Sequence, residues 1–157
     1  MTSAALIAMS HSPLLGYNPL PTDLDAELNA EFDKVRQFAA AHDPDLVVVM
    51  FPDHYNGFFY DVMPPFCIGA TATSIGDYAT GAGPLDVDED RAVRIATRVL
   101  DAGLDTAISY TMQVDHGAVQ PLEILFGDLA AKPVLPVFIN SVAPPFAPMA
   151  RVRQFGD

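Results

Sequence analysis

The chain has 157 residues, of which half are hydrophobic, and 20 acidic against 8 basic residues give a net charge of −12. This length suits one domain with a real core, and the acidic balance argues against nucleic acid or an anionic membrane surface as partner. The single cysteine, Cys67, excludes an internal disulfide framework and a zinc site built from several cysteines. No apolar stretch approaches the roughly 20 residues needed to span a bilayer. We therefore expect a cytoplasmic globular protein.

The first third of the chain predicts a strand, a helix and a second strand. ALIAMS, residues 5–10, is typical of a short buried strand. Residues 22–42 form an amphipathic helix in this prediction, because their apolar side chains recur at helical spacing: Leu24, Leu28, Phe32, Val35 and Phe38. LVVVMF, residues 46–51, is apolar throughout, as a parallel strand covered on both faces should be.

The rest of the chain continues the alternation. The Gly/Ala/Thr-rich residues 69–84 predict a loop with at most one short strand. The expected elements after it are a helix at 86–103, a strand at 106–112, a short helix at 118–129 and a strand at 134–140. Such alternation predicts an α/β fold with a mostly parallel or mixed sheet and helices on both faces. We expect one catalytic-type domain over residues 1–157, incomplete because PPFAPMARVRQFGD begins a helix and then stops.

Three of the four histidines follow the ends of predicted strands. His11, His54 and His116 each come just after one, whereas His42 ends a predicted helix, where it suits the helix dipole. Taken singly, each histidine is more often a satisfied surface group than a ligand. Three at one sheet edge favour a metal or acid/base site, since ligands bind at the carboxyl ends of parallel strands and imidazole suits Fe, Zn, Cu and Ni. Spacing leaves the metal and the third ligand open, with Glu123 as a weak candidate.

Four separate blocks of the chain resemble one known family. They are MSHSPLLGY (9–17), PDHYNGFFYDVMPPFCIGA (52–70), SYTMQVDHGAVQPLE (109–123) and VLPVFINSVAPP (134–145). Together they resemble class III extradiol ring-cleavage dioxygenases, and the long second block resembles the members that act in bacterial phenylpropanoid breakdown. The resemblance implies Fe(II)-dependent cleavage by O2 of a small aromatic diol, 2,3-dihydroxyphenylpropionate or 2,3-dihydroxycinnamate. It also implies a homo-oligomer.

The resemblance assigns roles to individual positions. His11 in SHSPL and His54 in PDHYN match the two histidines that bind Fe(II), and His116 in VDHG matches a histidine with an acid/base role. Tyr55 and Asn56, beside His54, are expected to contact the substrate. The family's third ligand, a glutamate, and its second catalytic histidine belong to a C-terminal half that has no counterpart in these residues. We therefore expect this chain to be the N-terminal portion of such an enzyme, and the missing positions put in doubt whether the chain is active by itself.

Other interpretations stay open at this point. One is a related catechol or protocatechuate-type dioxygenase on the same scaffold, against which the PDHYNGFFYDVMPPF block argues. Another is a non-catalytic homologue or interaction module that keeps the two-histidine site without the carboxylate. A third is an enzyme completed by a second chain that supplies the missing half.

Overall fold

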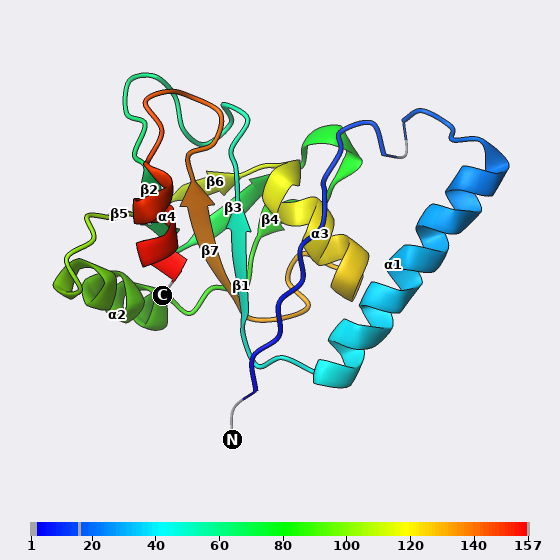
Figure 1. Ribbon diagram of the computed structural model, residues 1–157, viewed down its shortest axis with the longest axis horizontal. Coiled ribbons are helices and arrows are strands. Elements are labelled where there is room, and N and C mark those ends of the chain that lie inside the picture. The colour runs from blue at the N-terminus through cyan, green and yellow to red at the C-terminus, as the bar shows by residue number, and fades with distance from the viewer. Residues whose placement is uncertain (1–2, 16, 157) are drawn as a thin grey trace.

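The structure is a computed structural model that describes residues 3–15 and 17–156. It has an α/β fold, as predicted (Figure 1). In chain order the elements are α1 (Thr22–His42), β1 (Val47–Phe51), β2 (Phe66–Gly69), β3 (Ala72–Ile75), the 3-10 helix η1 (Asp77–Ala79), β4 (Ala82–Pro84), α2 (Glu89–Asp101), β5 (Ala107–Ser109), β6 (Met112–Val114), α3 (His116–Phe126), β7 (Val134–Ile139) and α4 (Met149–Gly156).

The strands form two mixed sheets. The larger has the order β1-β7-β2-β5, in which β1 runs parallel to β7 and β2 runs antiparallel to β7 and parallel to β5. The smaller has the order β4-β3-β6, with β3 antiparallel to β4 and parallel to β6. The prediction of a mostly parallel or mixed sheet is thus confirmed in its mixed form.

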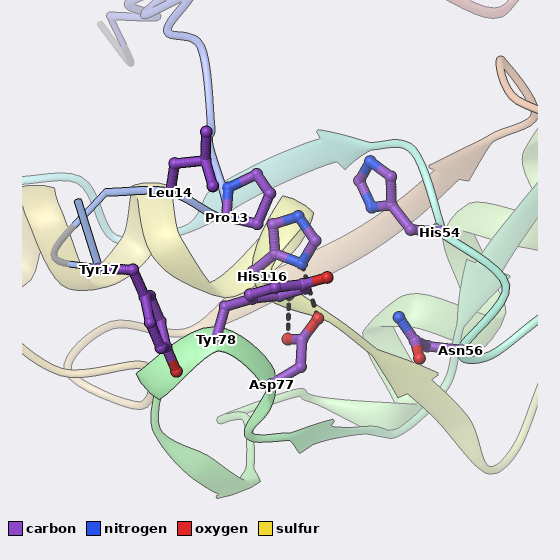
Figure 2. Close-up of a pocket in the computed structure, with 8 residues that line it drawn as sticks. All are labelled: Pro13, Leu14, Tyr17, His54, Asn56, Asp77, Tyr78 and His116. Atoms are coloured by element: carbon purple, nitrogen blue, oxygen red, sulfur yellow. Dashed lines mark hydrogen bonds and ion pairs between the residues drawn. The ribbon is translucent and has the colours of Figure 1, made fainter.

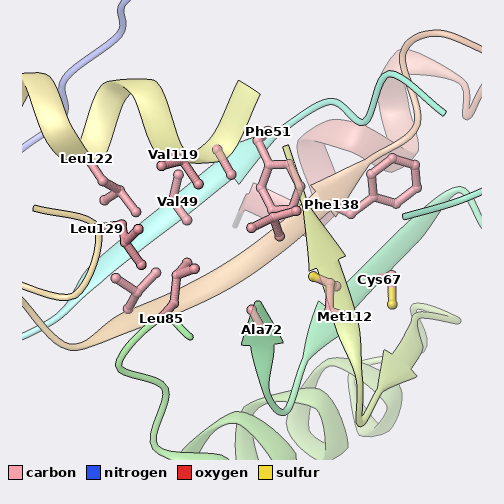
Figure 3. Packing of buried hydrophobic residues seen from close by; sticks show 13 residues of the cluster. Val49, Phe51, Cys67, Ala72, Leu85, Met112, Val119, Leu122, Leu129 and Phe138 are labelled. Atoms are coloured by element: carbon pink, nitrogen blue, oxygen red, sulfur yellow. The ribbon is translucent and has the colours of Figure 1, made fainter. Parts of the chain in front are cut away.

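Helices pack on both faces of the larger sheet. Side chains alternate along its strand β7, so neighbouring residues of β7 contact helices on opposite faces. Val134 and Phe138 of β7 pack in one apolar cluster with Val119 and Leu122 of α3 (Figure 3). The neighbouring β7 residues Leu135 and Val137 pack on the other face, in a second cluster with Ile68 of β2 and Ala92 and Ala96 of α2. The first cluster fixes the position of α3, the helix that carries His116.

The predicted strand at residues 5–10 is wrong. In the described part of the chain these residues pair with no strand, and Leu6 is 90% exposed. Figure 1 shows the N-terminal segment running past α3 outside both sheets. A short apolar run forms a strand only where a neighbouring edge accepts its backbone hydrogen bonds, and the sequence alone cannot supply that neighbour.

Other boundaries also differ from the prediction. Residues 69–84 hold β3, η1 and β4 rather than a loop with one short strand, and the predicted strand at 106–112 is two short strands, one in each sheet. The short helix begins two residues earlier than expected because Asp115 caps it, its side chain accepting a hydrogen bond from the Gly117 amide. It ends at Gly127, whose left-handed backbone (φ 81°) forms the C-cap.

None of the helices described here combines the length and the hydrophobicity that crossing a membrane would require.

Candidate metal centre

The structure brings His11, His54 and His116 together, as the sequence predicted. One ring nitrogen from each lies within 4.8 Å of the others. The Nε2 atoms of His11 and His54 are 3.3 Å apart, and the rings of His54 and His116 stack with centroids separated by 4.6 Å. The three side chains come from the N-terminal segment, the loop after β1 and the first turn of α3. His42 ends α1 and is not part of this group.

Asp115 fixes the orientation of His54. Its carboxylate, fully buried, accepts hydrogen bonds from His54 N at 2.8 Å, His54 Nδ1 at 3.0 Å and Asn56 Nδ2 at 3.0 Å. Burial alone would raise the pKa of the Asp115 carboxyl, but the bonds from Asn56, His54 and Gly117 outweigh burial and lower the pKa. The ionised carboxylate can only accept, so Nδ1 of His54 carries the proton and Nε2 presents its lone pair.

His116 is held in the same manner by a different carboxylate. Asp77, in η1, accepts from His116 N at 2.7 Å through Oδ1 and from His116 Nδ1 at 2.6 Å through Oδ2 (Figure 2). The opposite ring nitrogen, His116 Nε2, is buried and has no hydrogen-bond partner among the described residues. A buried ring nitrogen without a partner is costly unless a ligand or ion takes up its lone pair.

His11 is placed by its neighbour Ser12. The backbone N–H of Ser12 donates to Gln120 Oε1 at 2.8 Å, and Gln120 Nε2 donates to the Ser12 carbonyl at 2.9 Å. Burial, followed by repulsion from His54 and His116, lowers the pKa of His11, while Asp115 acts in the opposite direction. A lowered pKa favours the neutral imidazole, which is the form that binds metals.

The loop after β1 folds around a second buried carboxylate. Asp53 accepts hydrogen bonds from the amides of Asn56, Gly57 and Phe58 at 2.8 to 3.1 Å. Burial raises the pKa of Asp53 despite these bonds, which lower it. The wrapped loop turns Asn56 toward Asp115 and leaves Tyr55 in a left-handed conformation, with φ at 61°.

A cavity of about 720 Å³ opens beside the histidines. Its lining comes from the N-terminal segment, the loop after β1, η1 and α3, and consists of Pro13, Leu14, Tyr17, His54, Asn56, Asp77, Tyr78 and His116 (Figure 2). The edge of one aromatic ring meets the face of another where Tyr78 contacts His116, with centroids 4.9 Å apart. The volume and the mix of apolar walls with a few polar groups suit a small organic ligand. The lining holds no lysine or arginine among the residues described.

Two of the predicted site residues lie outside this constellation. The hydroxyl of Tyr55 pairs with that of Tyr60 at 2.8 Å, and Tyr55 is not among the residues that line the cavity. Glu123 Oε1 accepts from Gly81 N at 2.8 Å and belongs to no group of potential ligands among the described residues. Asn56, by contrast, lines the cavity as expected.

The sequence analysis did not find the supporting residues Asp77, Gln120, Tyr78 and Asp115, the last of which orients His54. Asp115 had a local signal, because an aspartate immediately before a helix is a typical N-cap. Asp77 and Tyr78 had none. Asp77 lies in a Gly/Ala/Thr-rich stretch, 39 residues from its partner His116.

The residues fit a metal ion. Two nitrogen ligands at right angles, each about 2.1 Å from an ion, lie about 3 Å apart, close to the spacing of the two Nε2 atoms. His54 has its Nδ1 on a carboxylate, the usual arrangement for a metal-binding histidine. Asp77, Asp115 and His116 also lie close together, but the carboxylate oxygens of that second group are already used in hydrogen bonds.

Comparison with known proteins gives a consistent result. Residues 5–157 match the family model described as the catalytic LigB subunit of aromatic ring-opening dioxygenase. The chain is 58% identical over 153 residues to the 2,3-dihydroxyphenylpropionate/2,3-dihydroxicinnamic acid 1,2-dioxygenase of Rhodococcus globerulus, covering 98% of this chain and 49% of that protein. It is 56% identical over 156 residues to the protein of the same name from Mycobacterium sp. (strain MCS), covering 99% of this chain and 50% of the relative. The chain therefore spans about half the length of these relatives.

Proposed function

Because this chain belongs to the family of catalytic LigB subunits of aromatic ring-opening dioxygenases, we propose that its histidine site serves Fe(II)-dependent extradiol cleavage of 2,3-dihydroxyphenylpropionate and 2,3-dihydroxycinnamate by O2. The substrates are those in the names of relatives more than half identical to it. The observation that carries the proposal is the pair of Nε2 atoms 3.3 Å apart beside the cavity.

In this proposal His11 and His54 hold the iron through Nε2. Two histidines and one carboxylate are the usual ligands of non-haem Fe(II) oxygenases, and they leave positions free for substrate and O2. Glu123 stays a prediction as the carboxylate, and its hydrogen bond to Gly81 N argues against it. When bound, Fe(II) supplies the redox chemistry that lets O2 react with the ring.

His116 takes the acid/base role. Its ring lines the cavity, and its buried Nε2 has no hydrogen-bond partner among the described residues, while Nδ1 is occupied by Asp77. An imidazole has an unperturbed pKa near neutrality, so one such nitrogen can accept a hydroxyl proton from the diol and return it later in the reaction. General acid–base help of this kind typically contributes about 10²- to 10⁴-fold in rate.

The walls of the cavity bind the ring and exclude water. Pro13, Leu14, Tyr17 and Tyr78 supply apolar surface for a planar aromatic substrate. Asn56, whose Nδ2 is held by Asp115, is placed to contact the substrate. Tyr55 stays a prediction as a substrate contact, since its hydroxyl is paired with that of Tyr60.

The proposal extends to the setting of the reaction. A dioxygenase with these substrates would act in the cytoplasm, in the breakdown of phenylpropanoids. We also propose that the protein assembles as a homo-oligomer, which light scattering or sedimentation would test.

The direct test is anaerobic loading of the chain with Fe(II), then addition of 2,3-dihydroxyphenylpropionate and air. Formation of the coloured ring-opened product is followed by absorbance. Product from the unaltered chain, none from His54→Ala, and unchanged turnover from His42→Ala, which makes the same substitution outside the cluster, would support the proposal.

Comparison substrates separate the alternatives. Faster turnover of catechol or protocatechuate than of 2,3-dihydroxyphenylpropionate would indicate a related dioxygenase instead. A folded chain that binds Fe(II) but forms no product from any of these diols would contradict ring cleavage by these residues alone and favour a non-catalytic module or a site completed by another chain.

A further inference from the structure

Asp77 is a half-buried carboxylate that the proposed reaction does not by itself require. It is not adjacent in sequence to any of the three histidines, and its side chain is 16% exposed. Both of its oxygens are directed at one residue: Oδ1 accepts from the backbone N–H of His116 and Oδ2 accepts from the ring at Nδ1. Among short side chains only an ionised carboxylate offers two acceptors to such a pair of donors.

This double contact determines which ring nitrogen of His116 carries the proton. The backbone N–H can only donate, so Oδ1 is committed to it. Oδ2 then faces Nδ1 at 2.6 Å, and an ionised oxygen there requires a proton on Nδ1. The neutral ring is therefore the Nδ1–H tautomer, with an unprotonated Nε2 that is buried, unpartnered among the described residues and part of the ring that lines the cavity.

The backbone around Asp77 is arranged to make this contact. Gly76, Tyr78 and Ala79 all have left-handed backbone, with φ at 72°, 47° and 61°. Two of the three are not glycine, and such conformations persist only where the surroundings impose them. The turn is tied to α3 a second time, because Gly81 N donates to Glu123 Oε1.

We propose that Asp77 is a positioning residue that holds His116 in its Nδ1–H tautomer and so presents an unprotonated Nε2 to the aromatic diol. The identity of the group that meets Nε2 rests on the proposed function. The tautomer itself does not, so the two can fail independently.

The test is nitrogen NMR of the metal-free chain labelled with ¹⁵N-histidine, at a pH where the rings are neutral. Nδ1 and Nε2 have different shifts when protonated and unprotonated, and two-bond correlations to the ring protons identify the tautomer. We expect His116, assigned by its loss in His116→Gln, to carry its proton on Nδ1. A His116 ring protonated on Nε2 would overturn the proposal, and this measurement needs no variant at Asp77.

Asp77→Asn should reverse the tautomer preference of His116. The side-chain amide has one acceptor, which the backbone N–H of His116 occupies, so its NH₂ group faces Nδ1 and favours the Nε2–H tautomer. Asp128→Asn is the matched control, since it removes the same charge from an exposed turn where the Asp128 side chain accepts from the backbone N–H of Ala130. An unchanged His116 tautomer in Asp77→Asn would also overturn the proposal.

A second readout separates positioning from the chemistry. In the Fe(II)-loaded chain, Asp77→Asn is expected to lower kcat about 10- to 100-fold while Fe(II) affinity stays within about twofold. If the tautomers are as expected but the unaltered chain turns over no diol, the proposed function fails and the positioning role of Asp77 stands. If kcat and the tautomer of the variant both match the unaltered chain, the positioning role fails.

Discussion

The two histidines proposed to hold iron lie side by side, yet the chain supports them differently. His54 follows a core strand, and its amide and ring both donate to the fully buried Asp115. His11 lies on the segment 3–15, which belongs to neither sheet and is tied to α3 through two hydrogen bonds between Ser12 and Gln120. The difference indicates that one half of the site forms with the core, whereas the other half docks onto it.

One face of α3 organises both halves. Three residues of α3 at helical spacing make these contacts. His116 contacts Asp77 of η1, and Gln120 contacts Ser12 of the N-terminal segment. Glu123 contacts Gly81, the residue just before β4. Loss of a contact on the core side should therefore destabilise the fold, while loss of a contact on the docked side should release the N-terminal segment and spare the fold.

The largest effect is expected from Asp115→Ala. The change leaves donors on His54, Asn56 and Gly117 without an acceptor and empties a fully buried site, so the free energy of unfolding should fall by about 3–5 kcal/mol. Urea denaturation measures it. Asp88→Ala, which removes an exposed cap of α2, is the control and should cost about 1 kcal/mol. Equal losses from the two variants would mean that His54 is not held by the core.

Gln120→Ala should separate binding from folding. Without its two hydrogen bonds to Ser12, the N-terminal segment loses its tether, and Fe(II) affinity should fall about 10- to 100-fold. The free energy of unfolding should change by only about 1 kcal/mol. Anaerobic metal titration and urea denaturation give the two numbers, with the exposed Gln113→Ala as matched control. If stability falls as far as it does in Asp115→Ala, the segment is part of the core and the comparison fails.

Metal binding should order the docked half selectively. Because His11 and His54 share the ion in the proposed site, anaerobic Fe(II) should slow amide hydrogen exchange in residues 5–14 by about tenfold, and a chelator should reverse the change. Exchange in β1 and β7 should stay the same, since these strands are already paired with each other in the larger sheet. Equal protection of the strands would argue against a docked segment.

The smallest effect is expected on the stability of the fold at acid pH. The folded state lowers the pKa of Asp115, so its ionised form stabilises the fold at pH values above its unfolded pKa of about 3.9. That contribution is lost as the pH falls from about 4 through the lower folded pKa. Stability measured between pH 2 and 6 should therefore fall more steeply toward acid in the unaltered chain than in Asp115→Asn. Parallel curves would contradict the assignment.

The elements that the sequence predicted well are those with a strong local pattern. The helix at residues 22–42 matches α1, and LVVVMF matches β1 to within one residue. The expectation that this strand is covered on both faces is wrong, because Val48 and Met50 are exposed on one face. The long apolar run and the amphipathic spacing are properties of the residues themselves. The strand expected at 5–10 fails because strand formation depends on a partner, and β2 was missed because its apolar residues follow a proline pair within an aromatic loop.

The site was predictable in its histidines and less so in their supports. His11, His54 and His116 come together although His11 follows no strand, so the prediction succeeded with part of its reasoning wrong. Asp77 could not be found from the sequence, because the contact joins a turn to a helix through a fold-dependent approach. Long-range pairs of this kind leave no periodic pattern in a single sequence.

The central claim is that His11 and His54, from two separate segments of the chain, form one metal site, and Fe(II) titration tests it most directly. Anaerobic calorimetry of the unaltered chain should give one bound ion, with affinity reduced at least about tenfold in both His11→Ala and His54→Ala and unchanged in His42→Ala. The absence of saturable Fe(II) binding, or equal affinity in all four proteins, would contradict the claim.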